Sequence, residues 1–293
     1  MEYQNEINEM LINHYDKDCI ISEIVRLGGL TNKTFKVATN KGTIIVRLPG
    51  PGTEELISRK EEKISNMLAC ELGIDPGIIY FDDTTGDKIS NYVEDAITMS
   101  PETLKEEKHL IQVAQILNKL HKCNVNTNII FDVFGMAKDY EDFMVNNKVS
   151  LFKNYAMYKE QVYLIKEKLN RYNQKLVPCH NDPLCENWIS GNGSMYLIDW
   201  EYAGMNDAMW DIADVSIEAM LNEKEDLLLL ENYFGRNITI DEKISFLANK
   251  IYLDYLWSLW GKTRVPFDDT MEDYANERFE RMKTNIKKIE VLL

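Results

Sequence analysis

The sequence has few histidines, few cysteines and no long apolar run, and each shortage excludes a class of protein. Its four histidines and five cysteines contain no Cys-x-x-Cys pair, which disfavours a zinc site. An odd number of cysteines favours reduced thiols over a disulfide framework. No stretch of about 18 apolar residues occurs, so the sequence predicts no transmembrane helix. The acidic N-terminus lacks the regions of a signal peptide, and we expect a cytoplasmic protein with no membrane insertion.

Positive charge is also scarce. The 293 residues include 33 Lys plus Arg against 48 Asp plus Glu, which gives a formal net charge of −15. Nucleic acid is disfavoured as the main partner, because neutralising phosphates needs a surplus of cations. The charge is compatible with a cationic small-molecule substrate, which a negative surface would concentrate. Hydrophobic residues at 45% indicate a folded chain, and its length suits two domains or two lobes around a cleft.

The character of the chain changes near residue 94. Before that point, β-branched runs and turn sequences predict strands over 20–27, 34–39, 43–48, 78–81 and 88–93, with helices over 2–14 and 53–71. After it, helical spacing predicts helices over 103–123, 139–172, 207–222, 241–262 and 270–290. The sequence therefore predicts an α+β fold of two lobes. The small β-rich lobe spans residues 1–94, and the larger, mostly helical lobe spans residues 95–293.

The most informative segment runs from residue 176 to residue 204. Within it, His180, Asp182 and Asn187 form the pattern His-x-Asp-x-x-x-x-Asn, and Asp199 follows at the end of a predicted strand. This is the spacing of a kinase catalytic loop and of its later metal-binding aspartate. A lone His-x-Asp is common by chance, whereas the full spacing followed by a strand-turn-strand is rare. The segment therefore predicts phosphoryl transfer.

The chemistry of phosphoryl transfer explains why these residue types stand at these positions. A carboxylate can orient the acceptor hydroxyl and accept its proton, so Asp182 is the candidate catalytic base. Magnesium prefers hard oxygen ligands that leave room for water and phosphate, so Asn187 and Asp199 are the candidate metal ligands. We interpret His180 as a residue that orients the loop by hydrogen bonding rather than one that reacts.

The small lobe is predicted to hold the nucleotide. Arg47 ends an apolar strand at the place where kinases have a phosphate-binding cation. An acidic residue on the following helix should pair with this cation. Glu62 is the first candidate for this pairing, and Glu61 is the second.

Two further segments of the small lobe are candidates for nucleotide binding. The loop Gly28–Thr34 has glycines, hydroxyls and backbone amides that suit a phosphate lid, and Thr31 and Asn32 are its candidate contacts. The segment around Tyr92 and Val93 lies where the two lobes join. Its backbone is predicted to pair with the adenine edge.

These residues resemble those of bacterial choline kinases, within the choline/ethanolamine kinase and aminoglycoside phosphotransferase superfamily, whose fold is protein-kinase-like. The resemblance covers nearly the whole chain. The segments that carry it are Gly28–Phe35, Ile45–Leu48, His180–Asn187, Ile198–Gly204, Trp210–Ala213 and the tryptophan pair Trp257 and Trp260. It implies ATP as phosphate donor, magnesium as cofactor and phosphocholine as product. By the same match, Tyr202, Glu218, Trp257 and Trp260 bind choline, and Asp211 supports the catalytic loop.

The acceptor site implied by the resemblance agrees with the chemistry of choline. A quaternary ammonium cannot donate ordinary hydrogen bonds, so aromatic faces and diffuse negative charge must recognise it. The predicted helix over 247–262 carries Leu253, Trp257 and Trp260 on one face. An aromatic stripe alone is more often core, and the resemblance reverses that preference for the two tryptophans. Further candidate walls, which the sequence does not rank above core packing, are Tyr252, Tyr255 and Tyr274.

Several alternatives stay open at the level of sequence. The acceptor could be ethanolamine, thiamine or an aminoglycoside, although a primary ammonium is better served by carboxylates than by an aromatic cage. A catalytically silent binding protein with a kinase fold is disfavoured by the intact Asp182, Asn187 and Asp199. A protein kinase is disfavoured because the sequence has neither a GxGxxG loop nor an Ala-Pro-Glu after Asp199. Monomer and homodimer are both compatible with the sequence.

Overall fold

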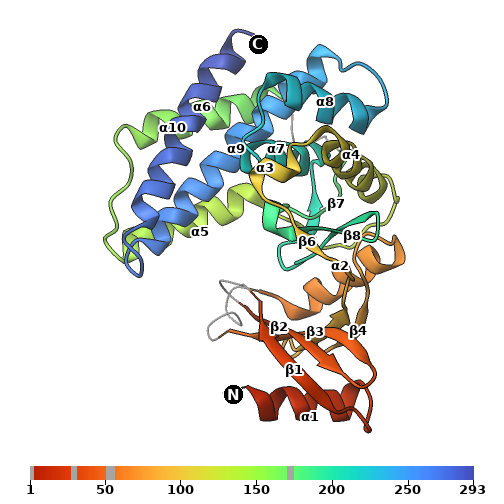
Figure 1. The fold of residues 1–293 in the computed structure, drawn as a ribbon. Helices are drawn as coiled ribbons and strands as arrows, with labels where there is room; N and C mark the ends of the chain where they lie inside the picture. Colours follow the sequence, from red (N-terminus) through yellow and green to blue (C-terminus); the bar gives the residue numbers. More distant parts are fainter. Residues whose placement is uncertain (1–2, 28–31, 51–56, 170–174) are drawn as a thin grey trace. The chain divides into compact units, whose positions relative to one another are not determined.

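The structure is a computed structural model that describes residues 3–27, 32–50, 57–169 and 175–293 (Figure 1). Its residues group into two compact units. The first unit contains Met1–Thr103 and Cys185–Gly204, and the second contains Leu104–Leu184 and Met205–Leu293. These units differ from the predicted lobes, because the segment that carries Asn187 and Asp199 groups with the β-rich part. The predicted lobe boundary near residue 94 stays a prediction.

An antiparallel sheet in the order β1-β2-β3-β5-β4 forms the main part of the first unit. Its strands are β1 (Ile21–Arg26), β2 (Asn32–Thr39), β3 (Gly42–Pro49), β4 (Ile78–Phe81) and β5 (Lys88–Asn91). A tight turn joins β2 to β3, and Gly42 has a φ of 122° there, a conformation that glycine adopts without steric cost. Phe35 lies opposite Val46, and both are buried. The strands predicted for this part of the chain are confirmed.

Helix α1 (Gln4–His14) lies against one face of this sheet (Figure 1). Its apolar residues Ile7 and Leu11 are fully buried, and they belong to the same hydrophobic cluster as Val37 and Val46. The helical spacing of Ile7 and Leu11 puts both side chains on the face that meets the sheet. Burying this apolar face is the main force that holds the helix in place.

Helix α2 (Arg59–Glu71) follows the sheet strand β3 and brings Glu62 into the interior. The side chain of Ser58 caps the helix by accepting a hydrogen bond from the backbone N–H of Glu61. The helix therefore begins at Arg59, later than the predicted residue 53, which lies outside the described residues.

A second, smaller sheet in the first unit positions the predicted metal ligands. It has the order β6-β8-β9, with β6 (Ile97–Thr98), β8 (Trp188–Gly191) and β9 (Ser194–Leu197), and the short helix η2 (Cys185–Asn187) precedes β8. Trp188 lies opposite Leu197, and both are fully buried. Gly191 meets the segment before β6 closely, since a Cβ atom there would lie 2.5 Å from Cγ1 of Val93. This packing fixes Asn187 at one end of β8 and Asp199 just beyond β9.

Helices make up most of the second unit. After α3 (Pro101–Leu104), these helices are α4 (Glu107–His121), α5 (Val133–Asn146), α6 (Tyr155–Lys168), α7 (Ala208–Glu218), α8 (Glu223–Phe234), α9 (Ile240–Arg264) and α10 (Met271–Glu290). The strands β7 (Val177–Cys179) and β10 (Gly204–Asn206) pair with each other. Helix α9 is central, because it packs against α5, α7 and α10. A capping box of Thr239 and Glu242 starts α9.

The structure corrects the predicted length of two helices. The single helix predicted over 139–172 is two helices, α5 and α6, and Lys148 and Asn154 in the connection have positive φ angles that no α-helix can contain. The helix predicted to end at residue 222 ends at Glu218, and Met220 has a φ of 52°. The predicted helices that correspond to α4, α9 and α10 are confirmed.

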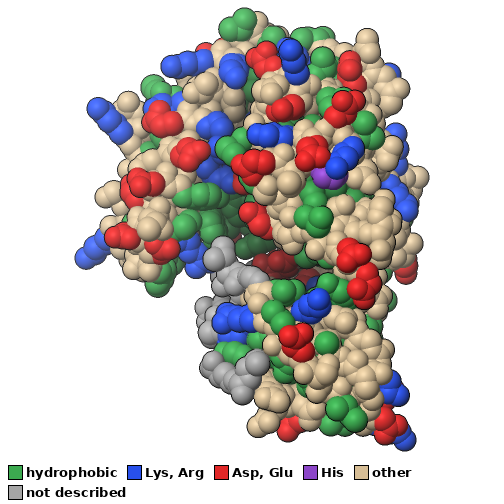
Figure 2. Space-filling model, in the orientation of Figure 1, with side chains coloured by type: hydrophobic (Ala, Val, Ile, Leu, Met, Phe, Trp, Pro, Cys, Tyr) green, Lys and Arg blue, Asp and Glu red, His purple; other side chains and the backbone are tan. Residues whose placement is uncertain are grey.

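Charge is distributed rather than segregated on the drawn surface. Figure 2 shows acidic and basic side chains interspersed over the face that it draws. Among the described residues, no helix is both long enough and apolar enough to cross a membrane.

Candidate active site

A cavity of about 400 Å³ in the first unit is lined by several of the predicted nucleotide contacts. Strands β2, β3 and β5 contribute Asn32, Arg47 and Lys88, and the segment that follows β5 contributes Tyr92 and Val93. The candidate metal ligand Asp199 also lines this cavity. The predicted contact Thr31 lies outside the described residues. The volume falls within the range of small-molecule sites.

Arg47 and Glu62 form a buried pair at this cavity. The Nη2 atom of Arg47 donates to Oε2 of Glu62 at 3.1 Å and to the carbonyl oxygen of Gly86 at 2.9 Å, and its Nη1 atom donates to Oε1 of Glu62. Burial opposes the charge on Arg47, but the carboxylate of Glu62 outweighs this effect and raises the pKa of Arg47. Nη1 of Arg47 also lies 3.9 Å from Oδ1 of Asp199. The pair therefore fixes a permanent cation beside the candidate metal ligand.

Two further cations lie around Glu62, and neither was predicted from the sequence. Arg59 donates to Oε2 of Glu62 at 2.7 Å, and Nζ of Lys88 lies 3.9 Å from Oε1. Burial of Glu62 works against its charge, but Arg47 and Lys88 lower its pKa. Burial, followed by the charge of Arg47, lowers the pKa of Lys88. Lys88 lies opposite Arg47 in the sheet, so only the strand register could have revealed it.

Glu201 is another carboxylate whose role the sequence analysis left unassigned. Its Oε2 atom accepts a hydrogen bond from Nδ2 of Asn32 at 3.1 Å and lies 3.7 Å from Nη1 of Arg59. Burial, followed by repulsion from the charge of Asp199, raises the pKa of Glu201 to about 7. Two acidic groups so close together need a counter charge to be ionised at the same time.

Asn187 and Asp199 are held in the first unit by backbone contacts. The carbonyl oxygen of Asn187 accepts a hydrogen bond from the backbone N–H of Ile198 at 2.9 Å, directly before Asp199. Asp199 has a φ of 69°, an uncommon conformation for a residue other than glycine. Its side chain keeps 38% of its surface exposed, so its carboxylate is accessible. The amide oxygen of Asn187 and the carboxylate of Asp199, with Glu201 near Asp199, form a donor set that fits magnesium.

The candidate base Asp182 lies in the second unit, in a loop that is held by Asp211. The two carboxylate oxygens of Asp211 accept hydrogen bonds from the backbone N–H groups of His180 and Asn181, both at 2.8 Å. Asn181 has a φ of 69°, and the backbone N–H of Asp182 contacts Nδ1 of His180 at 3.3 Å. His180 is fully buried, a position compatible with a role in orienting the loop. The supporting role expected for Asp211 agrees with these contacts.

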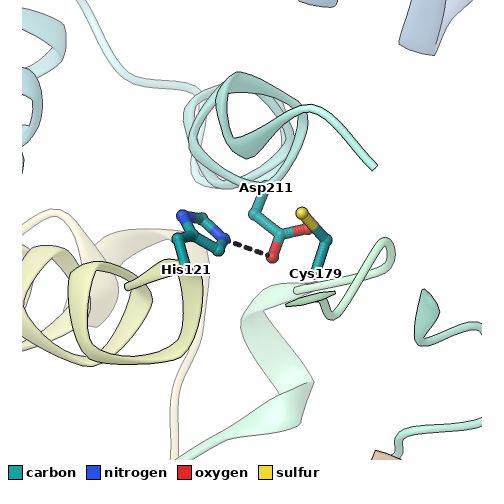
Figure 3. A group of neighbouring side chains, drawn as sticks. All are labelled: His121, Cys179 and Asp211. Carbon is teal, nitrogen blue, oxygen red and sulfur yellow. Dashed lines mark hydrogen bonds and ion pairs between the residues drawn. The ribbon is translucent and has the colours of Figure 1, made fainter. Parts of the chain in front are cut away.

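Asp211 is also part of a buried group with His121 and Cys179 (Figure 3). Nε2 of His121 lies 3.1 Å from Oδ2 of Asp211, and Nδ1 lies 2.9 Å from the hydroxyl oxygen of Tyr233. The ligand atoms of the three grouped residues lie within 4.8 Å of one another. The carboxylate oxygens of Asp211 already accept hydrogen bonds from the loop that carries Asp182, so we interpret the group as a support for that loop.

An aromatic cluster forms between α9 and α10 in the second unit. The ring centroids of Trp257 and Trp260 are 6.0 Å apart at 87°, and those of Trp260 and Tyr274 are 5.9 Å apart at 77°. These edge-to-face contacts join Tyr274 to the two predicted tryptophans. The other candidate walls differ, because Tyr252 and Tyr255 are both 1% exposed and lie in the core.

Glu218 joins the aromatic cluster through Arg278, a residue that the sequence analysis missed. The Nη2 atom of Arg278 donates to Oε1 of Glu218, and its guanidinium carbon lies 4.8 Å from the ring centroid of Tyr274. Burial opposes the charge on Arg278, but Glu218 and other neighbours raise its pKa. Tyr202, the other residue predicted to bind choline, belongs to the first unit, and its role stays a prediction. The structure thus brings Glu218, Trp257 and Trp260 together within one unit.

Comparisons with known proteins point to one family. A model of the choline/ethanolamine kinase family matches residues 23–255. The structure is similar to that of a choline/ethanolamine kinase family protein from Mesorhizobium loti, with a TM-score of 0.85, 31% identity, and coverage of 96% of this chain and 94% of the other. It is also similar to choline kinase LicA from Streptococcus pneumoniae, with a TM-score of 0.83, 28% identity, and coverage of 98% and 100%. LicA in complex with AMP gives a TM-score of 0.80 at 28% identity, with 99% of each chain covered.

These findings confirm the predicted α+β, kinase-like fold and the family resemblance. The roles of the individual site residues stay predictions.

Proposed function

This chain belongs to the choline/ethanolamine kinase family, and we propose that it transfers the terminal phosphate of ATP to the hydroxyl group of choline, giving phosphocholine. One observation carries the choice of acceptor. Trp257, Trp260 and Tyr274 form an aromatic cluster that Arg278 links to the carboxylate of Glu218. Aromatic faces with nearby negative charge recognise a quaternary ammonium, which donates no ordinary hydrogen bonds.

The nucleotide half of the proposal rests on the cavity of the first unit. ATP would place its adenine beside Tyr92 and Val93 and its phosphates beside Arg47. Glu62 keeps the guanidinium of Arg47 charged and fixes its direction. A bound AMP in the related LicA structure supports a nucleotide at this fold. Lys88, on the neighbouring strand, adds a second cation to the same wall.

The proposed mechanism assigns each step of proton and charge transfer to a residue. Asp182 would accept the proton of the choline hydroxyl as the oxygen attacks the terminal phosphorus. Asn187 and Asp199 would hold magnesium, with Glu201 as a further carboxylate near Asp199. When bound, magnesium neutralises charge on the phosphates of the nucleotide. Arg47 would stabilise the phosphate that is transferred.

The fold also limits where the catalytic base can lie. Asp211 binds the backbone N–H groups of His180 and Asn181, so the loop that carries Asp182 cannot rearrange without losing two buried hydrogen bonds. Preorganised groups of this kind lower the cost of reaching the transition state. We assign Asp211 to positioning, because its carboxylate oxygens face the loop backbone.

The cellular setting of the proposal is a reducing one. We propose a cytoplasmic location, in which the five cysteines would stay reduced. A homodimer is compatible with the proposal, although the proposed phosphoryl transfer needs the residues of only one subunit.

The experiment that tests the proposal is an assay of ATP consumption with magnesium across choline, ethanolamine, thiamine and kanamycin at equal concentrations. We expect turnover with choline to exceed turnover with ethanolamine by about tenfold or more, a discrimination within reach of one specific pocket. Asp182→Asn serves as the control for contaminating activity. Turnover with only another acceptor would reject choline but keep the phosphotransfer site, and no turnover would reject the proposal.

A further inference from the structure

Helix α7 carries three acidic residues on one face. Asp211, Asp214 and Glu218 stand at helical spacings of three and four residues, so their side chains project from the same side. Asp211 binds the backbone of the catalytic loop, and Glu218 binds Arg278 on α10. Asp214 stands between them, about 4.5 Å along the axis from Asp211 and about 6 Å from Glu218, at a rise of about 1.5 Å per residue.

Asp214 differs from its two neighbours because its carboxyl group has no hydrogen-bond partner in the described part of the chain. The residue is 1% exposed, and neither oxygen has a partner among the residues that the structure describes. Buried polar groups nearly always have such a partner, and a buried acid without one is unfavourable unless a ligand or a function compensates. The residue is therefore poorly explained by folding alone.

The charges around Asp214 indicate what kind of ligand would pair with its carboxyl group. Burial, the negative charge of Glu218 and that of Asp182 raise the pKa of Asp214 well above its ordinary value, and Asp211 adds to the effect. Arg278 acts in the opposite direction, but its hydrogen bond goes to Glu218. Asp214 included, these are four acids and one arginine, which leaves an excess of negative charge. A cationic ligand would correct this imbalance.

The same residues link Asp214 to both ends of the proposed acceptor. Asp182, Asp214, Glu218 and Arg278 all influence the hydroxyl of Tyr274, whose ring contacts Trp260 in the aromatic cluster. Asp214 is thus one helical turn from Asp211, which holds the loop of the candidate base, and one turn from Glu218, which Arg278 links to the aromatic cluster.

We propose that Asp214 is a further acceptor-binding residue, whose carboxylate supplies a second negative charge, beside Glu218, to the ammonium group of the acceptor. This inference rests on the proposed function. A consequence is that binding of a cationic acceptor displaces the proton of the Asp214 carboxyl into solvent, because the cation favours the ionised form. The charges that act on Asp214 are those of Asp211 and Glu218 on its own helix, Asp182 in the loop and Arg278 on α10. Asp214 acts in turn on Tyr274 of α10, and on α9, which packs against α7, Asp254 pairs with Arg278 and Arg281.

The test compares choline with dimethylbutanol, in which a carbon atom replaces the nitrogen, as ligands of the wild type and of Asp214→Asn. Asparagine keeps the shape of the side chain and removes its charge. We expect Asp214→Asn to weaken choline binding by about tenfold or more, as for loss of one partner of a desolvated charge pair. Binding of dimethylbutanol should change by about twofold or less, and Asp214→Glu should restore part of the preference for choline.

Asp226→Asn is the matched control, because Asp226 is an acidic residue of the same unit that is paired with Lys250 on α9. It should leave the preference unchanged. Asp214→Ser, which also lacks the charge, repeats the comparison if the asparagine variant does not fold. An equal loss for both ligands, or no loss for either, would overturn the inference and leave the proposed function intact. A wild type that binds neither choline nor ethanolamine would refute the proposed function and this inference with it.

Discussion

Arg47 on β3 and Glu62 on α2 are joined by two hydrogen bonds in the interior of the first unit, and Arg47 also lies 3.9 Å from Asp199. The two residues are 15 positions apart in the chain and come from different elements. Their pairing links the stability of the first unit to the shape of the cavity that Arg47 and Asp199 line.

Glu62→Gln should therefore impair both folding and nucleotide binding. Removing this carboxylate leaves Arg47, Arg59 and Lys88 buried without their shared partner, and we expect a loss of about 3 kcal/mol in the free energy of unfolding. The KM for ATP should rise while the KM for choline changes little. Glu61→Gln is the matched control, because Glu61 is exposed on the same helix. Equal effects of both variants in urea unfolding and in kinetics would contradict the pairing.

Asp182→Asn should abolish turnover and leave binding intact. The variant keeps the size of the side chain but cannot accept the hydroxyl proton, and we expect kcat to fall by about a hundredfold or more. Calorimetry should show choline affinity within about twofold of the wild type. A variant with normal kcat would rule out Asp182 as the base.

Trp260→Leu should weaken choline binding more than ATP binding. The change removes one aromatic face that contacts both Trp257 and Tyr274, and we expect choline affinity to fall by about tenfold, in line with a desolvated cation–π contact. Phe267→Leu is the control, because Phe267 follows α9 and is 74% exposed. Parallel increases in the KM for choline and for ATP would indicate that Trp260 only packs the core.

Asp211→Asn should slow turnover by loosening the catalytic loop. The amide keeps one oxygen acceptor, so one of the two loop N–H groups loses its partner, at a cost of about 2 kcal/mol in stability. We expect kcat to fall while both KM values stay near those of the wild type. Stopped-flow or steady-state kinetics would show this split, and an unchanged kcat would exclude the positioning role.

Asp214→Asn should stabilise the protein increasingly as pH rises. The folded state holds the Asp214 proton more tightly than the unfolded chain does, so this residue makes stability fall as pH rises from its unfolded pKa toward its higher folded pKa. The asparagine variant lacks this contribution. The difference in Tm between variant and wild type should be small near about pH 4 and should grow toward about pH 8. A difference that is independent of pH would mean that the carboxyl group titrates normally.

The site residues whose roles depend on local spacing could be predicted from the sequence. The interval from Asp182 to Asn187, and the position of Arg47 at the end of an apolar strand, are visible in a single sequence. The choice of Glu62 over Glu61 also agrees with the structure, because Glu62 is buried and Glu61 is exposed. Helical periodicity was sufficient to put Trp257 and Trp260 on one helix face.

The residues that sequence reasoning missed are those brought in by tertiary packing. Lys88 meets Arg47 only through the pairing of β3 with β5, and Arg278 meets Glu218 only because α10 packs beside the cluster. In the sequence, nothing separates Asp214 from the other acids of its helix; its burial, and its lack of a hydrogen-bond partner among the described residues, are visible only in the structure. The prediction of a single helix over 139–172 was wrong, because the break between the two helices depends on single residues with positive φ, which helical periodicity does not reveal.

The preference for choline can be measured by offering equal concentrations of choline and ethanolamine to the protein together with ATP and magnesium. Mass spectrometry of the products gives the ratio of phosphocholine to phosphoethanolamine, which equals the ratio of the two kcat/KM values at low conversion. We expect a ratio of about ten or more in favour of phosphocholine, and no product with Asp182→Asn. A ratio near one, an excess of phosphoethanolamine, or no phosphorylated product would contradict it.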